Sequence, residues 1–110
     1  MIRAQIFETV MSNQTRKITR FLIEGHAGSG EYGKDIVCSA VSALSINFVN
    51  SVEALCGTKL SYQASEGLMD VEVSDDEKTQ WLAQSLRVGL MGIAEEHSKY
   101  LRVKEQLLKK

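Results

Sequence analysis

Alternating apolar and polar residues predict strands at both ends of the chain. Residues 2–7 and residues 101–105 each have the two-residue period of a half-buried strand. Residues 17–24 form a further predicted strand, and the turn residues 12–14 separate it from the first. So short a connection predicts an antiparallel hairpin.

A helical period occupies residues 35–55. Gly57 is a plausible stop for this helix. Polar side chains lie opposite the apolar stripe, so one side of the helix should be buried. The predicted core positions are Val37, Val41, Leu44, Phe48 and Leu55.

A second helix is expected to start near Ser74. Ser74 stands three residues before Glu77, which is the spacing of a capping box. The helix should run to about Glu96. Its predicted core stripe is Leu82, Leu86, Leu90 and Ile93.

Two short strands, 59–63 and 68–73, are predicted around a turn at Glu66-Gly67. The order is then strand, strand, helix, strand, strand, helix, strand. This order favours an α+β fold with a mostly antiparallel sheet and both long helices packed on one face. Residues 1–110 are expected to form a single domain.

Several apolar residues fall outside the core stripes. Trp81 and Val88 lie seven residues apart on the second helix, with Met91 nearby, and Ile46 and Val49 are similarly placed on the first. They supply either extra core contacts or a dimer surface, since exposed apolar patches often mark interfaces.

Charge and composition narrow the classes of protein. The net charge is -1, which disfavours direct binding of nucleic acid. The basic residues Arg16, Lys17 and Arg20 are interpreted as a solvated strand face. No apolar run approaches the roughly 20 residues that cross a bilayer, and the N-terminus lacks the layout of a signal peptide. We therefore expect a cytoplasmic protein without a membrane partner, whose two cysteines stay reduced.

The most informative segment joins the second strand to the first helix. Residues 25–33 contain four glycines in nine residues and must form a loop. His26 lies just past the strand, and Cys38 lies in the first turn of the helix. Unpaired N–H groups and the helix dipole favour a thiolate there, and they could also hold an oxyanion. A histidine across the loop could take the thiol proton.

Two polar neighbours of Cys38 could support this chemistry. Asp35 lies three residues before Cys38 and Ser42 four residues after it, on neighbouring helix positions. A nearby carboxylate disfavours a thiolate, so we assign Asp35 to orienting His26. Spacing alone leaves structural roles open: a packed cysteine, a loop histidine and a helix-capping aspartate.

The segment from Gly25-His26-Ala27 to Gly33-Lys34-Asp35-Ile36-Val37-Cys38-Ser39-Ala40-Val41-Ser42 resembles the signature of the ribosomal-processing cysteine protease family. The chain also fits that family in length and element order.

The resemblance implies a catalytic role for Cys38 as nucleophile and His26 as base, supported by Asp35 and Ser42. It implies a substrate, the N-terminal extension of large-subunit ribosomal protein twenty-seven, cut after aromatic residues. It further implies a homodimer and a loop that orders over the peptide. The loop residues expected at the substrate are Gly25, Ala27, Gly28, Gly30 and Gly33.

Rival sites have weaker support. Gly28, Gly33 and Lys34 match the spacing of a phosphate loop, but Asp35 stands where Ser or Thr would ligate magnesium. Cys38 and Cys56 lie roughly 27 Å apart on one predicted helix, too far to share a metal ion. His97, at the end of the second helix, is interpreted as non-catalytic. We expect neither metal nor cofactor.

A function from another class remains open. A non-catalytic ribosome-associated binding or chaperone module could use the same loop to grip a ribosomal protein tail. Cys38 separates the two functions, because a protease needs its thiolate and a binding module does not.

Overall fold

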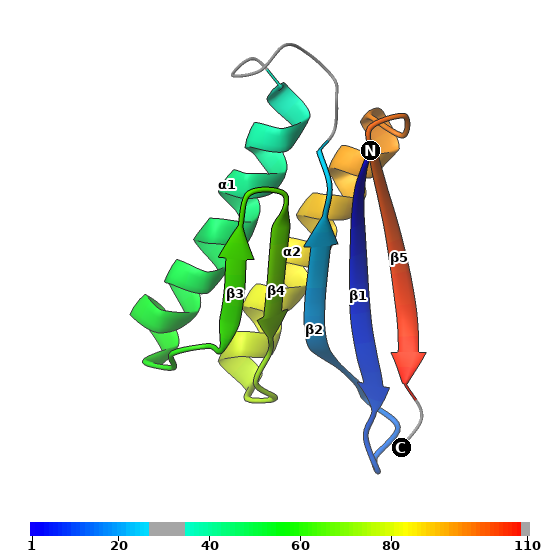
Figure 1. The fold of residues 1–110 in the computed structure, drawn as a ribbon. Helices are drawn as coiled ribbons and strands as arrows, with labels where there is room; N and C mark the ends of the chain where they lie inside the picture. The colour runs from blue at the N-terminus through cyan, green and yellow to red at the C-terminus, as the bar shows by residue number, and fades with distance from the viewer. Residues whose placement is uncertain (27–34, 109–110) are drawn as a thin grey trace.

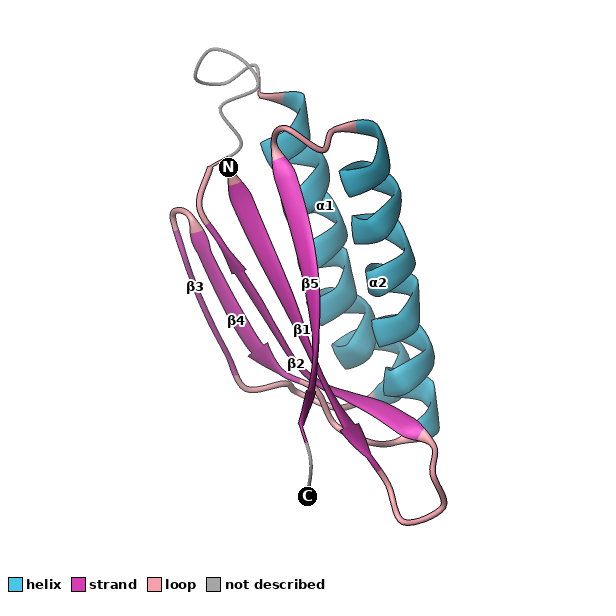
Figure 2. Ribbon diagram, turned by 90° about the vertical axis from the view of Figure 1, so that its right-hand side faces the viewer, coloured by secondary structure: helices cyan, strands magenta, loops and turns pink. Residues whose placement is uncertain are grey.

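The computed structural model describes residues 1–26 and 35–108. The predictions for Ala27, Gly28, Gly30 and Gly33 therefore lie outside the described residues. A five-stranded sheet forms one layer, and two long helices form the second layer on one of its faces (Figures 1 and 2). This confirms the predicted α+β fold.

The sheet is mixed. Its strands are β1 (Ile2–Val10), β2 (Arg16–Glu24), β3 (Tyr62–Ser65), β4 (Leu68–Glu72) and β5 (Leu101–Leu108), in the order β3-β4-β2-β1-β5. All neighbouring pairs are antiparallel except β1 and β5, which are parallel. The first and last strands of the sequence therefore lie side by side (Figure 1).

The helix layer contains α1 (Ile36–Ser51), which continues into a π-helical turn, η1 (Val52–Cys56), and α2 (Glu77–Glu96). Gly57 ends this first helix with a left-handed φ of 67°, as the sequence predicts. The two helices lie side by side and cover the same face of the sheet (Figure 2). The core fills the space between them and the sheet, and Phe21 packs edge-on against Phe48 at 5.4 Å there.

Leu55 is the clearest error in the predicted core. It was expected on the buried stripe of the first helix, but 68% of its surface is exposed. The π-helical turn advances by fewer degrees per residue than an α-helix. It therefore turns Leu55 outward, while Val52 in the same turn is fully buried. Val49, thought to lie off the stripe, is also buried.

Two local predictions need smaller corrections. The third strand spans Tyr62–Ser65 rather than 59–63, because it pairs with β4 across the Glu66-Gly67 turn. The N-cap of α2 is Asp76 rather than Ser74, and its carboxylate accepts the N–H of Thr79 at 3.1 Å. Ser74 instead donates its hydroxyl to Asp76 at 2.7 Å.

The first helix has the predicted length but is more apolar than expected. Residues Ile36–Cys56 form 21 helical residues with a mean hydropathy of 1.4 over the most apolar window, which is enough to cross a membrane by length and composition. The expectation that no apolar segment approaches the length needed to span a bilayer was therefore wrong. Core helices of soluble proteins pass the same test, and here Val37, Val41 and Phe48 pack into the core.

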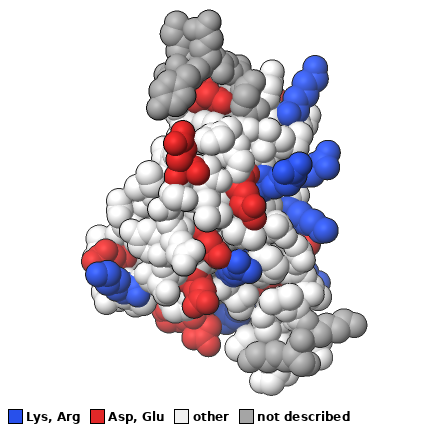
Figure 3. Space-filling model, in the orientation of Figure 1, with Lys and Arg blue, Asp and Glu red and all other residues white. Residues whose placement is uncertain are grey.

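Charges are distributed unevenly over the sheet face that the helices leave uncovered. Lys and Arg side chains gather on one side of the view in Figure 3, and Asp and Glu over its middle and other side. Arg3 and Arg102 are exposed and face each other in the β1–β5 pair. Arg20, expected to be solvated, forms a bidentate ion pair with Asp70 at 2.6 to 2.7 Å.

Candidate active site

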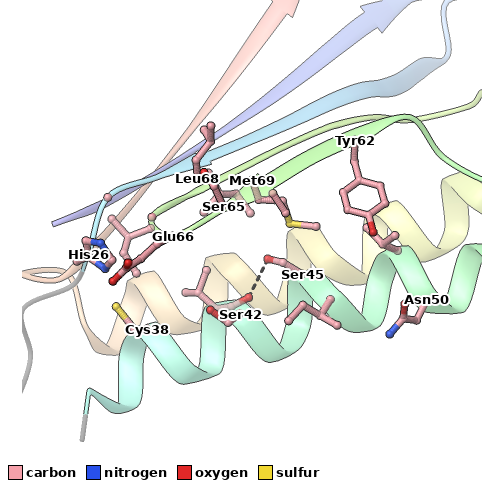
Figure 4. Close-up of a pocket in the computed structure, with 18 residues that line it drawn as sticks. His26, Cys38, Ser42, Ser45, Asn50, Tyr62, Ser65, Glu66, Leu68 and Met69 are labelled. Atoms are coloured by element: carbon pink, nitrogen blue, oxygen red, sulfur yellow. Dashed lines mark hydrogen bonds between the residues drawn. The ribbon is translucent and has the colours of Figure 1, made fainter. Parts of the chain in front are cut away.

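A cavity of about 410 Å³ opens between α1 and the β3–β4 hairpin. His26 and Cys38 lie at the same end of this cavity, as Figure 4 shows. The two side chains come from different elements, since His26 follows β2 and Cys38 begins α1. The fold therefore brings together the two residues that the sequence predicts as base and nucleophile.

Cys38 lies in the first turn of α1, as predicted, and is half-buried. Asp35 is the N-cap of this helix, and its Oδ1 accepts the backbone N–H of Cys38 at 3.0 Å. The N–H of Cys38 thus already has an acceptor in this structure, which differs from the expectation that it is open to an oxyanion. The assignment of Asp35 to His26 stays a prediction.

The backbone around His26 is held by two neighbouring segments. Gly25, with a φ of 95°, donates its N–H to the carbonyl of Gly67 at 2.8 Å. The carbonyl of His26 accepts the amino group of Met1 at 2.6 Å. The side chain of His26 itself is exposed at the mouth of the cavity.

Ser42 lies one helical turn beyond Cys38 and lines the same cavity. Its side chain is exposed, so it is accessible to a bound molecule. Ser45, one turn further, is buried and donates its hydroxyl to the carbonyl of Val41 at 2.7 Å. Ser42 is therefore the serine of this helix that is placed for a role in the cavity.

The cavity continues away from Cys38 between apolar side chains. Ile46 and Val49 line it from α1, and Tyr62 and Met69 line it from the hairpin (Figure 4). Asn50 lies toward the same end as Tyr62. This lining could accept an apolar side chain of a ligand that ends in a polar group or lies next to one.

The residues that the β3–β4 hairpin contributes to the cavity were not predicted from the sequence. Glu66 is the one carboxylate among the described residues that line the cavity, and it lies at the same end as His26 and Cys38 (Figure 4). The turn at Glu66-Gly67 was predicted, but its position beside His26 depends on how β4 pairs with β2. Among the hairpin residues, Tyr62 could have drawn attention as a binding residue, because it is a large aromatic side chain. It is half-exposed on the edge strand β3.

Other candidate chemistry lies elsewhere. His97 ends α2 and lines a separate hollow of about 470 Å³ between the two helices. Within residues 1–26 and 35–108, no group of three or more His, Cys, Asp or Glu side chains could hold a metal ion.

A thiol in the first turn of a helix, with an imidazole beside it at one end of an apolar cleft, is the arrangement of a cysteine hydrolase. The chain belongs to the cysteine protease Prp family, whose model matches residues 1–102.

Individual relatives agree with this assignment. A Staphylococcus aureus protein named ribosomal processing cysteine protease Prp is 33% identical over 96 residues, covering 83% of this chain and 90% of the relative. A Bacillus subtilis protein of the same name is 28% identical over 108 residues, covering 91% of this chain and 96% of the relative.

A solved structure shows the same fold with a peptide in place. The S. aureus essential ribosomal processing protease Prp, in complex with a covalently linked product peptide, matches with a TM-score of 0.85 and 30% identity. The match covers 96% of this chain and 100% of that one. The protein is therefore a cysteine protease of the ribosomal processing type.

Proposed function

We propose that this protease removes the N-terminal extension of large-subunit ribosomal protein twenty-seven, with Cys38 as nucleophile and His26 as base. The observation that supports this proposal is the placement of both side chains at one end of the cavity. The binding-module alternative gives no reason for a half-buried thiol in that place.

The proposed reaction follows from this placement. His26 takes the proton of the Cys38 thiol, and the sulfur forms a bond to the carbonyl carbon of the scissile peptide. The carbon–nitrogen bond then breaks, and His26 gives the proton to the leaving amine. Water, deprotonated by the same imidazole, hydrolyses the thioester and frees the sulfur.

The apolar part of the cavity supports cleavage after an aromatic residue. Val49, Tyr62 and Met69 offer a surface that an aromatic ring could fill, and Met sulfur makes favourable contacts with such rings. The S. aureus relatives were solved with a product peptide and with a substrate peptide, which supports a peptide as the ligand here.

Charge near the site also suits a ribosomal protein tail. Glu66 lines the cavity, and Glu24 is exposed just before Gly25. The described residues that line the cavity include no Lys or Arg. A basic peptide would thus meet complementary charge from these described residues.

The protein acts, in this proposal, as a cytoplasmic homodimer. Trp81 and Val88 lie on one outward face of α2, with 70% and 65% of their surfaces exposed. Ile46 is also exposed, but it lines the proposed substrate cavity, and this position accounts for its exposure. The α2 face has no such explanation, so it is the surface we assign to a second copy of this chain.

A peptide that spans the ribosomal extension tests the proposed reaction. Wild-type protein should cut it once, as read by mass, while Cys38→Ala and His26→Ala should leave it intact and remain folded. Cys56→Ala is the matched control, because Cys56 is the other half-buried thiol and lies outside the cavity. Binding without cleavage by the wild type would favour the chaperone alternative, and cleavage by Cys38→Ala would exclude Cys38 as nucleophile.

A further inference from the structure

We infer that Gly67, in the turn between β3 and β4, is a positioning residue that sets the place of the His26 imidazole. The inference rests on the proposed role of His26 as base. It assigns a function to a hairpin turn that lies 41 positions from His26 in the sequence (67 − 26).

The first observation is the closeness of Gly67 to the ring. A Cβ built on Gly67 would lie 2.9 Å from Nε2 of His26, 3.4 Å from Cε1 and 3.5 Å from Cδ2. The nearest of these distances is shorter than real Cβ atoms allow. The imidazole therefore occupies the space that any other residue at position 67 would fill.

The second observation is that the same turn holds the backbone before His26. The carbonyl of Gly67 accepts the N–H of Gly25 at 2.8 Å. On the other side, a Cβ on Gly25 would clash with the carbonyl oxygen of Met1, so the backbone just before β1 lies close there. His26 thus leaves the sheet between the hairpin turn and the start of β1.

The third observation concerns what else could orient the ring. Apart from Asp35 and Cys38, no side chain within residues 1–26 and 35–108 forms a hydrogen bond or ion pair with the His26 imidazole. Packing against Gly67 is thus a contact that limits where this ring can lie. A general base acts only within hydrogen-bond reach of its proton, so a displaced ring would lose rate.

The chain offers a matched control for the test. Gly57 also has a left-handed backbone, with a φ of 67° against 74° for Gly67, but a Cβ there would meet nothing within 4 Å. Gly57→Ala and Gly67→Ala therefore introduce similar backbone strain, and only the second introduces a contact with His26. Gly67→Asn adds the Cβ with less strain, because Asn tolerates this conformation.

The experiment compares peptide cleavage, with kcat and KM separated, and the pH dependence of Cys38 alkylation by iodoacetamide. Thermal unfolding of each variant fixes a temperature at which all are folded. We expect Gly67→Ala and Gly67→Asn to lose kcat by about tenfold or more, since small misplacements cost this much. We expect both to shift the alkylation profile, and Gly57→Ala to match the wild type in each measurement.

Two results would overturn the inference. One is a kcat for Gly67→Asn and Gly67→Ala equal to that of Gly57→Ala. The other is an equal loss in all three variants, which would assign the effect to backbone strain. His26→Ala in the same assay tests the proposed function separately from the inference about Gly67. If His26→Ala is active, His26 is not the general base, and the proposed function fails at that step.

Discussion

The two helices begin with the same side-chain arrangement. Asp35 caps α1 through the N–H of Cys38, and Asp76 caps α2 through the N–H of Thr79. An N-cap carboxylate satisfies a backbone donor and complements the helix dipole. The shared geometry means that capping and any effect on catalysis can be separated by comparing the two positions.

We predict that Asp35→Ala lowers the free energy of unfolding by about 1 kcal/mol, because it removes the cap. Asp35→Asn should keep most of that stability, since Asn also caps helices. If the charge of Asp35 supports His26, Asp35→Asn loses cleavage activity while it stays stable. Urea unfolding and peptide cleavage measure the two effects.

Asp76→Ala is the control for this comparison. It removes a cap far from the cavity and should lower stability with no change in kcat. Full activity in Asp35→Asn would limit Asp35 to its capping role.

At the scale of elements, Gln80 joins α2 to β2. It is buried, and its side chain accepts the N–H of Ile18 at 2.9 Å and donates to the carbonyl of Ile18 at 2.7 Å. It also donates to the carbonyl of Ser74 at 2.9 Å. The pairing of β4 with β2 extends only as far as Arg20, so Gln80 takes the place of a strand partner for Ile18.

We predict that Gln80→Leu destabilises the protein by about 2 to 4 kcal/mol, because it leaves buried backbone groups without partners. The midpoint of urea unfolding should fall accordingly. Gln84→Leu, one turn further along α2, should cause no comparable loss. An equal effect of the two substitutions would contradict the role given to Gln80.

A pair of glutamates joins β1, β5 and α2. Glu8 is buried, and burial together with a hydrogen bond to Glu105 and the charge of Glu105 raises the pKa of Glu8. The hydrogen bond from Glu8 and that from Arg87 lower the pKa of Glu105, and Arg16 has a smaller effect in the same direction. Of the two glutamates, Glu8 is therefore the one that takes up a proton first as the pH falls.

This pair makes stability depend on pH. Between the usual pKa of a glutamate and the raised pKa of Glu8, the folded chain holds a proton that the unfolded chain has released, so stability falls as pH rises through that window. Glu105 acts in the opposite sense. Its contribution to stability is present above the usual pKa of a glutamate and is lost as pH falls through the lowered pKa of Glu105.

We predict that Glu8→Gln raises the melting temperature at about pH 8 and changes it less at about pH 5, because an amide donates to Glu105 without a bound proton. Thermal unfolding across this range measures the difference. If the melting temperatures of the wild type and of Glu8→Gln differ by the same amount at every pH, the two glutamates do not share a proton.

The sequence predicted most of these elements but not how they meet. Alternation located β1 and β5, because their core positions are local and regular. The outward turn of Leu55 and the parallel pairing of β5 with β1 were not predictable, since both depend on packing between distant segments. Likewise, His26 and Cys38 could be proposed from the segment that carries them, whereas Gly67 could not.

At the scale of the whole molecule, the exposed face of α2 is the proposed dimer surface. We predict that Trp81→Glu and Val88→Glu give a monomer of 12.2 kDa, where the wild type has twice that mass in light scattering. A charge placed in an apolar interface is costly to desolvate.

Leu55→Glu is the control for the dimer, because Leu55 is exposed to nearly the same degree on the other helix. It should leave the mass unchanged. A monomeric Leu55→Glu together with a dimeric Trp81→Glu would move the interface to the first helix.

The strand order also determines how this chain can fold during synthesis. β1 lies inside the sheet, yet one of its two neighbours is β5, which is translated after all the other described elements. Until that strand leaves the ribosome, one edge of β1 has unpaired backbone groups that other chains could bind. Contacts between such distant segments also form slowly. The sheet of a nascent chain of this enzyme is thus expected to stay incomplete, and prone to aggregate, until β5 emerges.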